Sequence, residues 1–411
     1  MATPSAAPVL PAPPASTQPL KSTVRLPALD GVRGLAILLV LTNNLYPERP
    51  SIRLDQLVET ASNAGWIGVD LFFVLSGFLI TGILLDGKGA PNYFRNFYAR
   101  RFLRIFPLYY GVLLVLLALV AWGGIGTPEE RAHYLERQGW YWTYLVNLMT
   151  AWIGSGAAKF GTSPFWSLAV EEQFYLIWPL VVSLLPRRRL VSLSLLLLAA
   201  AVALRTTWRI AGLNPEAMYL LTPARMDTLA VGALLAVGAR SSAVRDTLAR
   251  GSPVVLGAAG ALLLALAVWR GGLSAEDVAV QTAGYTLIGL MFGSLIAVLV
   301  TGDRSPRLRR AFEMPPLRLL GRYSYGIYIF QGPVMFGLER SVPFVRTLPR
   351  VFGSQVPAAL LVLVSASALS IGLAMVSWHC YETRFLRLKH RFPSDGATVG
   401  TQDDMASPRH D

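Results

Sequence analysis

The sequence predicts an all-α integral membrane protein, built as a bundle of ten transmembrane helices with both termini in the cytoplasm. Three observations lead to this fold class. Of the 411 residues, 53% are hydrophobic and only 15% are charged, and the mean hydropathy of +0.47 is too apolar for a water-soluble chain of this size. The apolar residues form ten runs of about 20 residues, the length that crosses a bilayer. The basic residues concentrate in alternate loops.

The ten runs define the predicted spans, which lie at 29–46, 66–85, 104–123, 165–185, 190–208, 218–239, 253–269, 279–301, 319–338 and 356–380. A further apolar stretch at 140–153, WYWTYLVNLMTAWI, is shorter and rich in Trp and Tyr. These residues favour the headgroup level of a membrane. We therefore expect this aromatic segment to lie in the outer interface or to re-enter the membrane without crossing it.

The distribution of basic residues sets the orientation. With ten spans and a cytoplasmic N-terminus, 24 of the 37 Lys and Arg residues are on the cytoplasmic side, ten are outside and three lie deeper within spans. The 24 include Arg33 and Arg104, which lie at the cytoplasmic ends of their spans. If the aromatic segment crossed, every later loop would invert, leaving 14 inside and 20 outside. The excess of positive charge on the cytoplasmic side favours the first topology.

The ends of the chain differ from its centre in composition. Residues 1–24 form an arm rich in Pro and Ala, and residues 392–411 form a polar tail. Neither can bury a core, so we expect disorder on both sides of a single transmembrane domain at 25–391. The net charge of +13 is spread over short loops, which argues against a nucleic-acid partner. One cysteine, Cys380, and four scattered histidines predict no metal site.

Several ionisable residues lie inside the predicted spans, where each costs about 2.5–3.5 kcal/mol on insertion scales. They are Asp30, Arg33, Asp70, Arg104, Glu171, Glu172, Arg205, Arg225, Asp227 and Arg322. Some could form structural ion pairs, such as Arg33 with Asp30 and Arg225 with Asp227. The whole set, however, indicates a polar cavity inside the bundle.

Helical spacing places some of these residues on common faces. Eleven residues, about three turns or 16 Å, separate Arg33 from Asn44, so both should lie on one stripe of the first span. Arg101 and Arg104 are three residues apart and share a face at the start of the third span. This pair suits a phosphate ligand, although ordinary positive-inside anchoring explains its charge equally well.

Two adjacent carboxylates, Glu171 and Glu172, lie in the fourth span. Adjacent helical positions differ by about 100°, so we expect only one of them to face the cavity, where it could act as a general acid or base or bind sugar hydroxyls. Gln331 shares a face of the ninth span with Ser324 and Tyr328. This polar stripe could line the cavity or could form hydrogen bonds between helices.

Seven motifs together resemble acyltransferase family 3, the membrane O-acyltransferases that modify bacterial surface glycans, lipids and some antibiotics. The resemblance runs from about Leu26 to Phe385. The motifs are LDGVRGLAILLV, GVDLFFVLSGFLITGIL, RRFLRIFPLYY, FWSLAVEEQFYLIWP, ARMDTLAVGALLA, RYSYGIYIFQGPV and YETRF.

The resemblance implies a multi-pass protein of the bacterial inner membrane. It also implies an acyl-CoA donor, most commonly acetyl-CoA, that arrives from the cytoplasm, and an acceptor hydroxyl on a glycan, lipid or small molecule. Arg33, Arg101 and Arg104 match family arginines and would bind the CoA phosphates. The catalytic candidates are Asn44, Glu171 and Glu172. The candidate substrate-binding residues are Asp70, Trp166, Arg225, Asp227, Tyr328 and Gln331.

Two positions depart from the family pattern. Asn44 occupies the place of the histidine taken to activate the acceptor, and Gln331 occupies the place of a second histidine. An amide can orient a hydroxyl but cannot take its proton. The chain could therefore be an acyltransferase that uses Glu171, Glu172 or Asp70 as its base, or a degenerate protein that binds acyl-CoA or a glycan. A transporter is the third alternative, although no internal repeat is visible.

Overall fold

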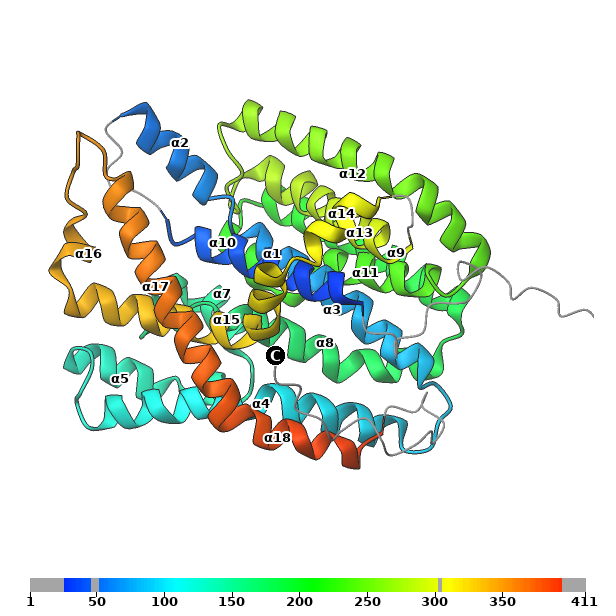
Figure 1. The fold of residues 1–411 in the computed structure, drawn as a ribbon, viewed down its shortest axis with the longest axis horizontal. Helices are drawn as coiled ribbons and strands as arrows, with labels where there is room; N and C mark the ends of the chain where they lie inside the picture. Colours follow the sequence, from blue (N-terminus) through cyan, green and yellow to red (C-terminus); the bar gives the residue numbers. More distant parts are fainter. Residues whose placement is uncertain (1–25, 46–51, 302–304, 394–411) are drawn as a thin grey trace, which may run out of the picture.

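The computed structural model describes residues 26–45, 52–301 and 305–393 (Figure 1). The regular structure of these residues is helical apart from an isolated bridge between Val351 and Ser354. This agrees with the predicted all-α class. The arm at 1–24 and all but the first two residues of the tail at 392–411, for which we predict disorder, lie outside the described residues.

The helices up to residue 210 are α1 Pro27–Thr42, α2 Arg53–Ser62, α3 Ile67–Asp86, α4 Tyr93–Ala121, α5 Pro128–Glu136, α6 Gln138–Trp142, α7 Val146–Ile153, η2 Ser155–Ala157, α8 Phe165–Leu184 and α9 Arg187–Ile210. The later helices are α10 Pro215–Leu220, α11 Thr222–Gly238, α12 Ser242–Arg270, η3 Val280–Gly284, α13 Tyr285–Thr301, α14 Pro306–Phe312, α15 Pro315–Ser341, α16 Pro343–Thr347, α17 Val356–Ser377, η4 Trp378–Glu382, α18 Thr383–Arg387 and η5 Leu388–Arg391.

Each of the ten predicted spans falls on one of these helices or on a pair of consecutive helices. By length and composition, seven helical stretches in the described part of the chain could cross a membrane. The predicted spans outside these seven lie on α1, α8 and α15. The chain is thus a multi-pass membrane protein, while the crossing of α1, α8 and α15 remains a prediction. These three helices carry many of the polar residues predicted for a cavity.

The aromatic segment at 140–153 does not form one continuous helix. It folds into α6 and α7, separated by a bend at which Tyr144 has a φ of 54°. The Tyr109 hydroxyl of α4 donates a hydrogen bond to the Tyr141 carbonyl at 2.9 Å, and Gln173 of α8 donates one to the Tyr144 carbonyl at 3.0 Å. The segment therefore packs against residues that lie inside two predicted spans, and its place in the outer interface or as a re-entrant segment stays a prediction.

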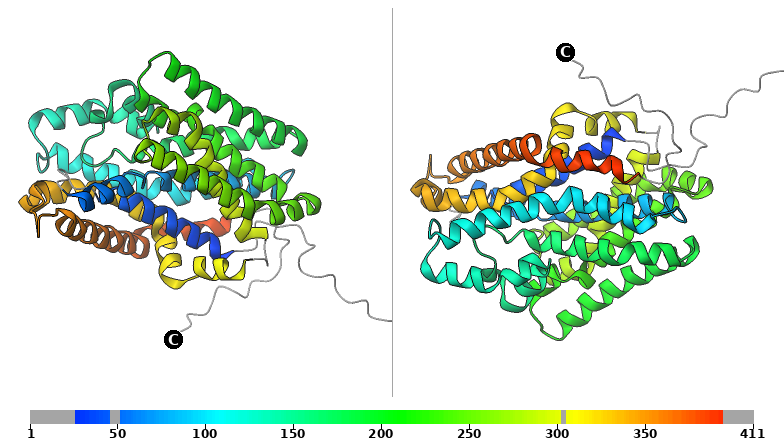
Figure 2. Two further views of the ribbon diagram at one scale, coloured as in Figure 1. Left: turned by 90° about the horizontal axis from the view of Figure 1, so that it is seen from above. Right: turned by 90° about the horizontal axis from the view of Figure 1, so that it is seen from below.

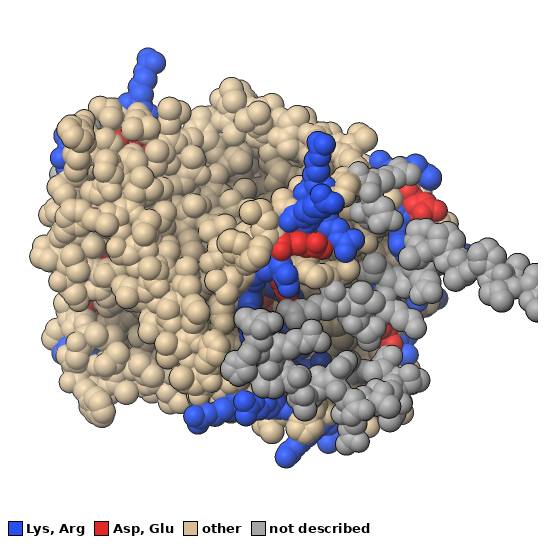
Figure 3. Space-filling model, in the orientation of Figure 1, with Lys and Arg blue, Asp and Glu red and all other residues tan. Residues whose placement is uncertain are grey.

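Loops that share one predicted side of the membrane contact each other. Lys88 donates a hydrogen bond to the Leu185 carbonyl at 2.7 Å, and Arg240 forms an ion pair with Asp86. Figure 3 shows Lys and Arg side chains gathered toward one end of the visible face, while the other end carries little charge. This arrangement follows the asymmetry that the positive-inside count predicts.

The bundle places α17 on one side and α9 on the other, with α1 and α3 between them (Figure 2). Helices α1 and α15 approach very closely. A Cβ atom on Gly34 would lie 2.0 Å from the Leu317 carbonyl oxygen, and one on Gly321 would lie 1.7 Å from the Asp30 carbonyl oxygen. Only glycine permits this contact between backbones. The contact fixes the position of Arg33, which lies between these glycine contacts on α1.

Candidate functional site

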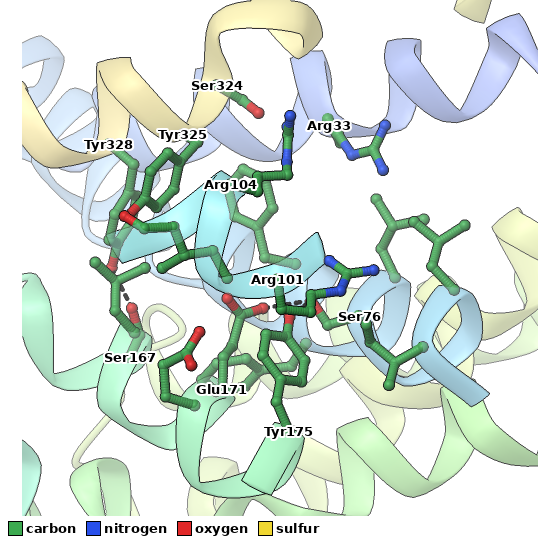
Figure 4. A pocket seen from close by; sticks show the side chains of 18 of the residues that line it. Arg33, Ser76, Arg101, Arg104, Ser167, Glu171, Tyr175, Ser324, Tyr325 and Tyr328 are labelled. Carbon is green, nitrogen blue, oxygen red and sulfur yellow. Dashed lines mark hydrogen bonds between the residues drawn. The ribbon is translucent and has the colours of Figure 1, made fainter. Parts of the chain in front are cut away.

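A polar cavity of about 120 Å³, hereafter the central cavity, lies among α1, α3, α4, α8 and α15 (Figure 4). Its charged lining residues are Arg33, Arg101, Arg104, Glu171 and Glu172. All five are residues that the sequence predicts for the site. Segments far apart in the chain therefore converge on one cavity, as the set of ionisable residues within spans indicates.

The basic part of the central cavity comes from α1 and α4. Arg33 donates a hydrogen bond to Asp30 at 2.8 Å, which confirms that predicted pair. The Arg101 guanidinium lies 5.5 Å from the ring centroid of Tyr175, and neither Arg101 nor Arg104 forms a hydrogen bond with another described residue. Their N–H groups are therefore available to an anionic ligand. The described residues contain no cluster of His, Cys, Asp or Glu suited to a metal ion.

The acidic part comes from α8. Glu171 accepts a short hydrogen bond from Ser76, whose hydroxyl accepts one from Tyr175 at 3.0 Å (Figure 4). Oε1 of Glu172 is buried and has no hydrogen-bond partner among the described residues. Both carboxylates line the cavity, so the expectation that only one would face it is wrong. Glutamate side chains are long, so two adjacent positions of α8 can both reach the central cavity although they point about 100° apart.

Asn44 and Gln331 contact each other directly. The Asn44 amide donates a hydrogen bond to Oε1 of Gln331 at 3.2 Å, across 287 residues of sequence. Neither lines the central cavity. Tyr328, about one turn before Gln331 on α15, does line it, and its hydroxyl lies 2.6 Å from that of Ser167. The amide pair therefore lies next to the cavity along α15.

Three other candidate residues form a separate buried cluster. Arg225 donates a hydrogen bond to Asp70 at 2.5 Å, and both side chains are completely buried. The ring centroid of Tyr219 lies 5.2 Å from the Arg225 guanidinium and 4.6 Å from the ring centroid of Trp166. Asp70, Trp166 and Arg225 are thus brought together, but none of them lines the central cavity.

The expected pair of Arg225 with Asp227 does not form. Asp227 instead pairs with Arg205 of α9, at 2.8 Å. Residues two apart in a helix point in roughly opposite directions, so Arg225 and Asp227 reach different neighbours. In each observed pair, the two charged residues come from different helices. One pair joins α11 to α3, and the other joins α11 to α9.

Several uncharged residues of the central cavity are not among the predicted site residues. They are Ser76, Ser167, Tyr175 and Tyr325. Two of them had a usable signal. Ser76 is an isolated polar residue in the apolar run DLFFVLSGFLI, and Tyr175 follows Glu171 by four residues, which places it on the same helical face.

The chain is similar to known proteins over most of its length. Residues 26–379 match a family model described as an acyltransferase domain, that of acyltransferase family 3. The peptidoglycan O-acetyltransferase OatA of Listeria monocytogenes is 29% identical over 328 residues, which cover 75% of this chain and 49% of the relative. The putative peptidoglycan O-acetyltransferase YrhL of Bacillus subtilis is 31% identical, with 75% and 48% coverage.

The O-acetyltransferase OatA of Staphylococcus aureus is 27% identical over 338 residues, which cover 75% of this chain and 50% of the relative. The chain therefore spans about half the length of the curated relatives it matches. No solved structure matches it. Because the family model covers most of the described residues, including every charged residue of the central cavity, the chain belongs to acyltransferase family 3.

Proposed function

We propose that this protein is a membrane O-acyltransferase that moves an acyl group, most commonly acetyl, from acyl-CoA to a hydroxyl group. The acceptor is a glycan of the cell envelope, a lipid or another alcohol. The observation that carries the proposal is the meeting of three guanidinium groups and two carboxylates in one cavity within the bundle. The similarity to proteins named as peptidoglycan O-acetyltransferases supports a glycan acceptor.

The donor side of the cavity is cytoplasmic in this proposal. All ten predicted spans cross the inner membrane of a bacterium, and both termini lie in the cytoplasm. The contacts of Lys88 with Leu185 and of Arg240 with Asp86 support this topology, because each joins segments predicted to share the cytoplasmic side. Arg33, Arg101 and Arg104 would then bind the phosphates of CoA, since guanidinium groups suit bidentate phosphate contacts.

The transfer step requires a group that accepts the acceptor's proton. Asn44 and Gln331 cannot do this, because amides do not titrate in the physiological range. We assign the role to Glu172, whose buried Oε1 has no partner in the described part of the chain. The acceptor oxygen attacks the thioester carbonyl, its proton passes to Glu172, the C–S bond breaks, and the CoA thiolate leaves. Glu171, already bound by Ser76, is less available for this task.

The test is acyl transfer by the purified protein in liposomes, with labelled acetyl-CoA and a glycan acceptor. Glu172→Gln should lower kcat by about 10²–10⁴-fold, the usual contribution of a general base. Its affinity for acetyl-CoA should change little. Arg101→Ala should instead weaken acetyl-CoA binding. If Glu171→Gln abolishes transfer while Glu172→Gln retains it, the assignment between the two carboxylates is reversed.

A second function is favoured by the hydrogen bond between Asn44 and Gln331. The side-chain amides of these two residues bind each other at the positions where the family resemblance places histidines. A protein that binds acyl-CoA or a glycan without transfer would have this arrangement. Acetyl-CoA binding without turnover, followed by turnover in Asn44→His, would favour this reading. If the unchanged protein transfers the acyl group and Glu172→Gln removes this activity, binding without transfer is excluded.

A further inference from the structure

A second cavity of about 310 Å³, hereafter the lateral cavity, lies between α4, α8 and the bend before α7. Arg101, Glu172 and Tyr175 line both this cavity and the central cavity. These three side chains therefore form a common wall between the two. The other surfaces of the lateral cavity include Phe102, Phe106 and Leu176.

The lateral cavity faces the outside of the bundle. Phe102 is 53% exposed and Leu176 is 69% exposed, and both line it. Further along α8, Leu180 is 51% exposed. In a membrane protein, exposed apolar side chains on the outside of the helix bundle face lipid. Whatever enters this cavity from the bilayer must itself have an apolar part.

Two of the residues that line the lateral cavity each carry a buried polar atom without a partner. Oε1 of Glu172 and the hydroxyl of Tyr144 each form no hydrogen bond with any described residue. A buried polar group without a partner costs about 1–3 kcal/mol, so a ligand that satisfies it gains affinity. The acyl chain of a thioester offers no hydrogen bond to either group. An alcohol donates one and accepts another.

We propose that the lateral cavity is the access and binding site for an amphiphilic alcohol, an acceptor whose hydroxyl is attached to a membrane-resident apolar chain. This inference rests on the proposed acyltransferase function and narrows its acceptor class. The apolar chain lies against Phe102, Phe106 and Leu176. The hydroxyl reaches Glu172, which also lines the central cavity, where the thioester lies.

The experiment uses the full chain in lipid nanodiscs with labelled acetyl-CoA and two acceptors, methyl and dodecyl N-acetylglucosaminide. The dodecyl glycoside should have a KM at least tenfold lower than the methyl glycoside. In Phe102→Trp and Leu176→Trp, which fill the cavity, the KM for the dodecyl glycoside should rise at least fivefold, whereas the two control variants should leave it unchanged. The matched controls are Leu114→Trp on α4 and Leu180→Trp on α8, because both residues are similarly exposed but lie outside both cavities.

A dodecyl glycoside with a diazirine on its chain provides a readout that does not need turnover. Crosslinks to Phe102, Phe106, Leu145 or Leu176 are expected, and they should be lost in Leu176→Trp. Crosslinks without acyl transfer would keep the site and overturn the proposed function. Transfer with equal KM for both glycosides, or crosslinks confined to other helices, would keep the function and overturn the lateral site. Protection from crosslinking by decanoyl-CoA but not by dodecyl glycoside would assign the cavity to the donor chain instead.

Discussion

Arg225 is completely buried, and its guanidinium lies 4.1 Å from the ring centroid of Tyr285 as well as against Asp70. Removing one ion of a buried pair typically costs 3–5 kcal/mol, because the other charge stays behind unpaired. We expect Asp70→Asn to lower the unfolding free energy in detergent by about this amount. A double-mutant cycle should show strong coupling of Asp70 to Arg225.

The same cycle distinguishes the observed partner of Arg225 from its neighbour in sequence. Asp227 contacts Arg205, so Asp227→Asn should couple strongly to Arg205→Met and weakly to Arg225→Met. Equal coupling of Arg225 to Asp70 and to Asp227 would contradict the pairing of Arg225 with Asp70.

Glu130 lies in α5, outside the predicted spans, and provides a pH-dependent contact. The Thr127 backbone N–H and the Arg340 guanidinium hold the pKa of Glu130 below its ordinary value of 4.5. This contact therefore stabilises the fold fully above pH 4.5, and its contribution is lost as the pH falls through the lowered pKa. Hydrogen-exchange protection of α5 should decrease over this acidic range. In Glu130→Gln the protection should be lower at neutral pH and should show little of this decrease.

Single residues differ in how far the sequence predicts their role. Arg33, Arg101 and Arg104 could be predicted for one site because a charge inside a span is costly and needs a polar environment. Ser76 and Tyr175 carry no such penalty. Their contacts with the site depend on the packing of α3 against α8, which a single sequence does not determine. The pairing of Asn44 with Gln331 depends on the packing of α1 against α15, which a single sequence does not determine.

At the scale of helices, the contact between α1 and α15 controls the shape of the central cavity. Gly321→Ala would place a methyl group 1.7 Å from the Asp30 carbonyl oxygen, so the helices must move apart. Arg33 would shift with them. We expect thermal stability to fall and the KM for acyl-CoA to rise by at least fivefold, measured on the purified variant. Gly337→Ala, on the same helix but in open space, is the control and should leave both values unchanged.

Helix boundaries show what hydropathy can and cannot find. Every predicted span coincides with helical structure, because the apolar length needed to cross a membrane is a strong signal. Helix α4, however, begins at Tyr93 and not near residue 104. Its first turns, YFRNFYARR, are amphipathic and basic, and Arg100 donates a hydrogen bond to the Phe392 carbonyl at 2.9 Å. Hydropathy registers only the apolar part of such a helix.

At the scale of the whole molecule, the ten-span topology is open to a direct test. In a Cys380→Ser background, Arg188→Cys and Ser274→Cys each introduce one exposed thiol. The predicted topology places residue 188 in the cytoplasm and residue 274 outside. A membrane-impermeant maleimide applied to intact cells should therefore label only the Ser274→Cys protein. Labelling of both, or of residue 188 alone, would contradict the proposed orientation.

Arg101, Glu172 and Tyr175 each have surfaces in two cavities. A molecule that displaces any of them from one side changes the space and the free hydrogen-bonding groups on the other side. Thermodynamic linkage then requires reciprocity, since the factor by which donor alters acceptor affinity equals the factor by which acceptor alters donor affinity. The binding of the donor and the binding of the acceptor would thus be coupled through three shared side chains, although the two substrates do not touch in their resting positions.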